Sequence, residues 1–129
     1  MRRRDDRRQG IAAVEFALLL PVIVLLILLL VEGSNAMHTY SALVEASREG
    51  ARHVVMEGEN ADVEGLVAAV LADLDSNGLS TKVTTDTVAN TVTVEVSYVY
   101  QMFGSQSGQD MFGNDTAPTF VAQTTMPLP

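Results

Sequence analysis

The 129-residue chain contains no cysteine, so no disulfide can brace any part of it. A chain of this length forms one small domain at most. An exported domain of that size without disulfides depends on its own packing or on neighbouring subunits. The absence of cysteine therefore leaves a thin hydrophobic core as the main source of stability.

Basic residues are scarce after residue 10. From Ile11 onward, Arg48, Arg52 and Lys82 oppose fourteen acidic residues, whereas residues 1–10 hold five arginines and two aspartates. Nucleic-acid binding needs a basic face, so this acidic balance argues against a nucleic-acid partner. Because short basic flanks stay in the cytoplasm, the same division predicts a cytoplasmic N-terminus if the chain crosses a membrane.

The sequence also lacks an arrangement typical of an enzyme. His38 and His53, the only histidines, are fifteen residues apart with no cysteine nearby, which favours surface histidines over metal ligands. No Ser/His/Asp set and no Gly-rich phosphate loop is indicated. We therefore expect a non-enzymatic protein without a cofactor, a metal or a small-molecule substrate.

The main feature that is present is an apolar run from Ile11 to Val31, in which Glu15 is the only charge. Its 21 residues would extend ~30 Å as a helix, the thickness of a bilayer's hydrocarbon core. The apolar core of a cleaved secretory signal is shorter, at about 7–15 residues. The run predicts a transmembrane helix at 11–32, preceded by a basic cytoplasmic leader at 1–10.

Helical periodicity continues beyond this span. Small or apolar residues recur at spacings of three and four within 33–57, at Ala36, Tyr40, Leu43, Val44, Ser47, Ala51, Val54 and Val55. They predict one helix from about 11 to 57, embedded first and amphipathic afterwards. Residues 58–129 form the predicted extracytoplasmic head. A second helix is expected there from Ala61 to about Asp75, ended by Asn77-Gly78.

The rest of the head carries β-strand patterns. Lys82–Val88 is rich in Thr and Val, Thr91–Met102 alternates between apolar and polar residues, and Ala89-Asn90 suits a hairpin turn. Gly104–Thr119 reads as a loop, and Phe120–Met126 as a closing strand. These patterns predict an α+β fold in which a small antiparallel sheet, with one extra helix, packs on the stripe of the long helix.

Glu15 needs an explanation, because an acid at the centre of a membrane helix costs about 2.5–3.5 kcal/mol and less near the interface. Glu15 lies about one turn inside the apolar run. A carboxylate there either reaches the headgroup region without a function or marks a functional contact.

The residues around Glu15 resemble a known processing site. A basic leader ends at Gly10, the apolar helix starts at Ile11, and Glu15 and Phe16 follow at the fifth and sixth positions after the glycine. The stretch GIAAVEFALLLP resembles type IV pilin-like proteins, most closely the TadE-like minor pilins, or pseudopilins, of tight-adherence (Tad) secretion systems.

A second stretch extends this resemblance. The segment EASREGARHVV is similar to the family's Ala-x-x-Gly-Ala-Arg stretch, formed here by Gly50, Ala51 and Arg52, with Ser47 replacing a frequent alanine. Together the two stretches cover roughly the first 57 residues.

The resemblance implies that a membrane-embedded prepilin peptidase cuts between Gly10 and Ile11. It also implies that Glu15 then pairs with the N-terminal ammonium of an adjacent subunit, which would set the axial register. The implied partners are other pilins, Tad membrane assembly proteins and the bacterial inner membrane, with the C-terminus extracytoplasmic or carried into a surface pilus for adhesion or secretion. Small side chains would permit close helix packing in lipid, at Ala12, Ala13 and Ala17.

A weaker motif suggests a metal. Asp73, Asp75 and Asn77 lie in a D-x-D-x-N-G stretch, which resembles the start of a calcium loop. The twelfth position is Thr84 rather than a bidentate acid. A solvated helix end is therefore the favoured interpretation, and calcium the alternative.

Two other functions stay open. The first is an uncleaved single-pass anchor that presents a small acidic protein-binding head. The second is a secreted protein released after Ser34-Asn35-Ala36. The N-terminus distinguishes them, because the pilin, anchor and secreted forms start at Ile11, Met1 and Met37.

Overall fold

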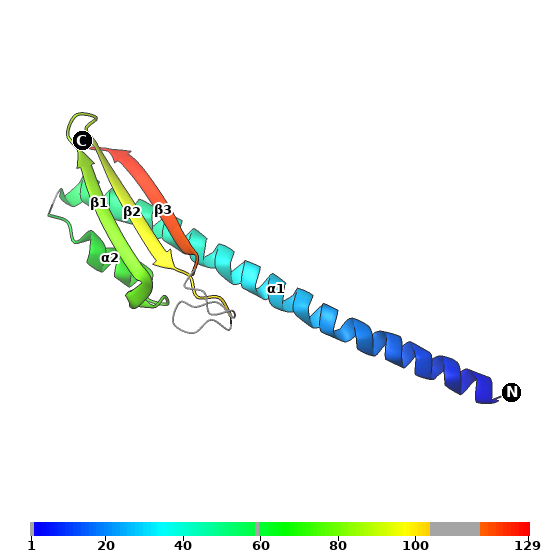
Figure 1. The fold of residues 1–129 in the computed structure, drawn as a ribbon. Coiled ribbons are helices and arrows are strands. Elements are labelled where there is room, and N and C mark those ends of the chain that lie inside the picture. The colour runs from blue at the N-terminus through cyan, green and yellow to red at the C-terminus, as the bar shows by residue number, and fades with distance from the viewer. Residues whose placement is uncertain (1, 59, 104–116) are drawn as a thin grey trace. The chain divides into compact units, whose positions relative to one another are not determined.

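The computed structural model describes residues 2–58, 60–103 and 117–129. The chain divides into two units, Met1–Asn35 and Ala36–Pro129, and the helix α1 (Arg2–Glu57) runs through both. The second unit, which we call the head, adds α2 (Val63–Val70), a 3-10 turn η1 (Ser76–Gly78), β1 (Leu79–Asp86), β2 (Thr91–Val99) and β3 (Thr119–Pro127) (Figure 1). This element order confirms the predicted α+β fold. The finer division of the chain at residues 33 and 58 stays a prediction.

In the first unit, α1 begins at Arg2, so the helix includes the predicted span of about 11–57 and also extends back through the leader. Arginine and glutamine are strong helix formers, and a single glycine at position 10 costs too little to end a helix. Pro21 also lies inside α1 without ending it. Among the described residues, α1 is the one helix long and apolar enough to cross a membrane.

In the head, residues 36–57 of α1 and the helix α2 cover one face of the sheet (Figure 1). The central strand β2 alternates, with Val92, Val94, Val96 and Tyr98 buried beneath the helices and the intervening residues facing outward. The other buried apolar side chains come from all the surrounding elements, at Leu43, Ala46, Ala51, Val54, Val63, Val67, Leu71, Tyr100 and Ala122.

The sheet has the strand order β1-β2-β3, and both pairs are antiparallel. The hairpin turn predicted at Ala89-Asn90 is confirmed, because β1 ends at Asp86 and β2 starts at Thr91. Asn90 adopts φ 53°, a left-handed conformation that asparagine tolerates. Asp86 stabilises the turn, because its Oδ1 accepts hydrogen bonds from the amides of Val88 and Ala89.

Several predicted boundaries in the head were wrong. Helix α2 ends at Val70, well before Asp75, because Leu71 leaves the helical conformation and the chain turns into η1. Asn77-Gly78 therefore lies in η1 and does not end a helix. The buried stripe of α2 nevertheless continues, since Leu71 still faces the core.

The strands are displaced from their predicted ends as well. Strand β1 starts at Leu79 rather than Lys82, because its pairing with β2 extends to Tyr98. Strand β2 ends at Val99 rather than Met102. Beyond it, the amide of Tyr100 donates to the carbonyl of Pro118. The predicted loop at Gly104–Thr119 lies outside the described residues except for its last three positions.

Candidate functional site

The expected processing residues lie within α1. Gly10 is exposed, and a Cβ built on it would have no atom within 4 Å. Ile11 is exposed too. The bond between Gly10 and Ile11 is therefore uncovered by the rest of the described chain, although in this state it is helical.

Glu15 and Phe16 follow on the exposed surface of the same helix. Glu15 is four residues after Ile11, so the two side chains share one face of α1. The three alanines expected to permit close packing are exposed as well, at Ala12, Ala13 and Ala17. No segment among the described residues covers them, so this surface of α1 is open to another helix.

The second motif lies in a different environment. Gly50 is buried where α1, α2 and β2 meet, and a Cβ at this position would lie 3.0 Å from Val63 Cγ1 and 3.2 Å from Val94 Cγ1. Ala51 is also buried, whereas Arg52 is exposed. Gly50 and Ala51 thus build the core of the head, and Arg52 is the member of the motif available to a partner.

Ser47, the departure from the family pattern, makes a buried polar contact that sequence reasoning missed. Its Oγ lies 2.8 Å from the Val44 carbonyl and 2.7 Å from Thr124 Oγ1. A hydroxyl has one proton. Because Ser47 donates to Val44, Thr124 donates to Ser47. This bond joins α1 to β3 across 77 residues of sequence, and an alanine at position 47 could not make it.

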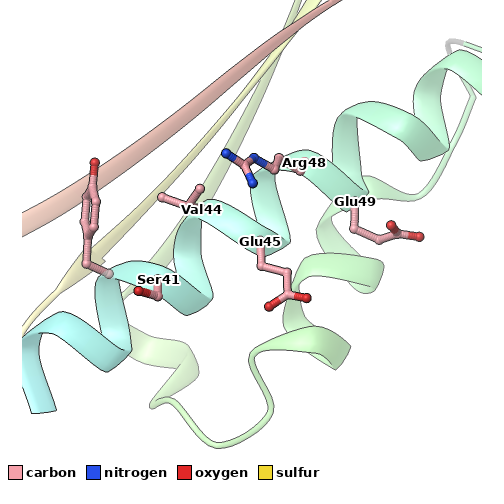
Figure 2. A pocket seen from close by; sticks show the side chains of 6 residues that line it. Ser41, Val44, Glu45, Arg48 and Glu49 are labelled. Atoms are coloured by element: carbon pink, nitrogen blue, oxygen red, sulfur yellow. The ribbon is translucent and has the colours of Figure 1, made fainter.

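An open groove of about 610 Å³ is lined by residues of α1 in the head. Figure 2 shows Arg48 pointing to one side of the helix, while Glu45 and Glu49 point to the other. Val44 and Ser41 complete the labelled lining (Figure 2). All three charged side chains are exposed. The groove therefore has the character of a solvated helix face rather than of a built binding site.

The calcium candidates are exposed: Asp73 lies in the turn after α2, Asp75 caps η1 and Asn77 lies within η1. Asp75 Oδ1 accepts a hydrogen bond from the amide of Asn77, which caps η1. Thr84, the twelfth position of the motif, lies within β1. In the described part of the chain, no group of three or more His, Cys, Asp or Glu residues is placed to hold a metal ion.

A comparison with known families gives a match that contains both the processing residues and the second motif. Residues 10–52 match the TadE-like protein family. The match begins at Gly10, contains Glu15 and ends at Arg52. No curated protein and no solved structure matches the chain.

The TadE-like segment covers about a third of the chain and includes residues of both units. It contains the exposed apolar part of α1 and the buried part that carries Gly50. This match bears out the suspected resemblance to TadE-like proteins over residues 10–52. The TadE-like family is a structural rather than an enzymatic class, and the match suggests a protein associated with the Tad pilus.

Proposed function

We propose that this protein is a minor pilin or pseudopilin of a Tad-type type IV pilus, matured by prepilin peptidase between Gly10 and Ile11. The observation that carries the proposal is the TadE-like match, which starts at Gly10 and includes Glu15. The exposed apolar surface of α1 supports it, because such a surface needs lipid or neighbouring helices around it.

The helix offers a physical reason for cutting at Gly10. A peptidase needs its substrate extended, so the bond must leave the helical conformation before it is cut. Glycine weakens a helix interior by about 0.5–1 kcal/mol relative to alanine. Within α1, unwinding is therefore easier at Gly10 than in the leucine-rich run that follows. The cut would also remove the basic leader.

Glu15 would then direct assembly. In lipid an unpaired carboxylate is penalised, and an opposite charge in a low dielectric lowers that penalty. The new ammonium at Ile11 of an adjacent subunit is such a charge. Pairing with Glu15 would favour docking and fix the axial offset between subunits, while Ala12, Ala13 and Ala17 let the helices approach.

The proposed location follows from the same elements. The protein would cross the bacterial inner membrane once, with the leader in the cytoplasm and the head outside, because the leader carries the basic charge. Its partners would be prepilin peptidase, other pilins and the Tad membrane assembly proteins. We expect no nucleic acid, small-molecule substrate or cofactor among them.

The test is the Glu15→Gln variant expressed in the native host, which keeps the size of the side chain and removes its charge. We expect normal membrane insertion and at least a tenfold loss of the fraction that co-purifies with other pilins, equivalent to about 1.4 kcal/mol. The matched control is Glu45→Gln, an exposed acid of the same helix outside the apolar run. Equal co-purification of the two variants would contradict the proposed role of Glu15.

One observation favours a second function. Because α1 already begins at Arg2, the uncut chain is a continuous helix across Gly10 and Ile11. An uncleaved single-pass anchor that presents the acidic head would keep this state. That function predicts a mature chain that starts at Met1.

A further inference from the structure

Among the described residues of the head, the end where the chain enters from the apolar run carries almost no charge. It is built from four segments without Asp, Glu, Lys or Arg, which we call the uncharged end: residues 36–44, 78–81, 97–103 and 117–122. Strand pairing brings three of them together, since Tyr98 pairs with Leu79 on one side and Phe120 on the other. The fourth joins through Tyr40, whose ring lies 6.3 Å from that of Phe120.

Aromatic rings and exposed apolar side chains gather at this end. Tyr100 stacks on Phe120 with ring centroids 5.0 Å apart. Met37 is 75% exposed and Phe103 is 77% exposed. Further apolar side chains of the uncharged end that reach solvent are Tyr40, Val99, Met102 and Val121.

The remainder of the described head is acidic. Charged side chains resume at Glu45 on α1 and continue through α2 and the loops that flank it. In the sheet, Lys82 and Glu95 face each other across β1 and β2, away from the strand ends at Leu79 and Val99. Asp110 and Asp115, the two acids between Phe103 and β3 in the sequence, lie outside the described residues.

Only a short stretch of sequence separates the uncharged end from the apolar run. Met37 follows Val31, the last residue of that run, by six positions within α1. Six helical residues rise ~9 Å. One headgroup layer of a bilayer is about 5–8 Å thick. With the apolar run in the hydrocarbon core, Met37 cannot lie far from the lipid headgroups.

We propose that the uncharged end of the head rests on the lipid surface of the membrane that holds α1. Aromatic and apolar side chains gain free energy at the headgroup level, and neutral residues avoid repulsion by anionic lipids. The acidic remainder of the head is thereby kept away from that surface. This inference rests on the proposed membrane anchorage, but not on the proposed role in a pilus.

The experiment uses the absence of tryptophan from the chain, because one introduced indole is then the only one. The full chain carrying Phe103→Trp is reconstituted into phosphatidylcholine/phosphatidylglycerol vesicles, with or without lipids brominated near the headgroup. We expect a blue-shifted emission that loses at least half of its intensity in the brominated vesicles. Met37→Trp is the second reporter at this end and should behave alike.

Val88→Trp is the matched control. Val88 is 96% exposed in the turn between β1 and β2, at the opposite end of the sheet. The length of β2 separates the two ends by ~26 Å, which is more than a headgroup layer. The emission of Val88→Trp should therefore stay red-shifted, and the brominated lipids should not quench it.

A third variant, Leu25→Trp, tests whether the apolar run lies in the bilayer. Its vesicles contain lipids brominated deep in their acyl chains. Quenching of Leu25→Trp without quenching of Phe103→Trp and Met37→Trp would overturn the inference and leave the anchorage standing. No quenching of Leu25→Trp would overturn the anchorage as well. A blue shift of both reporters without quenching would show that protein, such as a second copy, covers the uncharged end, and would also overturn the lipid contact.

Discussion

The two parts of α1 have opposite surroundings within one continuous helix. From Ile11 to Val31 every side chain is exposed, although nearly all are apolar. From Ala36 to Glu57 buried side chains recur at helical spacing and face the sheet. Leucine is thus exposed at position 30 and fully buried at position 43.

This difference shows where each part of the helix obtains its stability. The head buries its stripe against its own sheet and α2, so its fold depends on residues of this chain. The apolar run finds no such partner in the described residues. Because exposed apolar surface of this extent is unfavourable in water, we expect lipid or other subunits around it. Substitutions matched between the two parts should separate these contributions.

The largest contrast is expected for leucine. Leu43→Ala removes a fully buried side chain from the core, and such changes destabilise by about 2–5 kcal/mol. Leu30→Ala removes a side chain that is 71% exposed, so the stability of the head should not change. Urea unfolding of the full chain in nanodiscs, followed by tyrosine fluorescence, measures both. Equal midpoints would contradict the division of α1 into two environments.

Glycine offers a second matched pair. Gly50→Val places methyl groups where even a Cβ lies 3.0 Å from Val63 Cγ1, and overpacking of this kind costs about 1–3 kcal/mol. Gly33→Val meets nothing within 4 Å of the new Cβ and should leave the head unchanged. The same urea titration tests the pair. If Gly50→Val left the urea midpoint unchanged, α2 would have to move aside at little cost in free energy.

The bond between Ser47 and Thr124 should have a smaller effect. Replacing both residues, by Ser47→Ala and Thr124→Val, completes a double-mutant cycle with the two single variants. We expect a coupling of about 1 kcal/mol, the usual net contribution of a hydrogen bond. A coupling near zero would mean that water satisfies Thr124 equally well. Ser41→Ala, on the exposed side of α1, serves as the control for the change in helix propensity.

The smallest effect is expected from Asp86 in the turn between β1 and β2. Hydrogen bonds from the amides of Ala89 and Val88 lower the pKa of its carboxyl below the ordinary value of 3.8. A lowered pKa in the folded state stabilises the fold above that ordinary value, and the contribution is lost as the pH falls through the folded pKa. Asp86→Asn should therefore make the loss of stability in acid less steep. An unchanged slope in a pH series of urea titrations would contradict this.

Much of the fold could be predicted, because its signals are local. The alternation of β2 and the composition of β3 predicted the sheet, and the spacing within 36–57 predicted the buried stripe of α1. The end of α2 could not be predicted, since Val63, Val67 and Leu71 keep one spacing whether or not the helix continues. The segment after α2 leads into Leu79, which pairs with Tyr98, a contact distant in sequence that local spacing does not show.

The residues of the candidate site were predictable to different degrees. Gly10 and Glu15 stand out because a glycine and an acid are costly in an apolar helix, and the family match begins at the first and includes the second. The packing role of Gly50 had one local signal, a glycine in a helix interior. The bond of Ser47 had none, because Thr124 is 77 residues away.

The most direct test of the proposed function is the N-terminal sequence and intact mass of the protein purified from its native membrane. A chain that starts at Ile11 is the predicted result, because it requires the cut after Gly10 that a prepilin peptidase makes. A chain that starts at Met1 would contradict the pilin function and support an uncleaved anchor. A start at Met37 would contradict both and identify a secreted head.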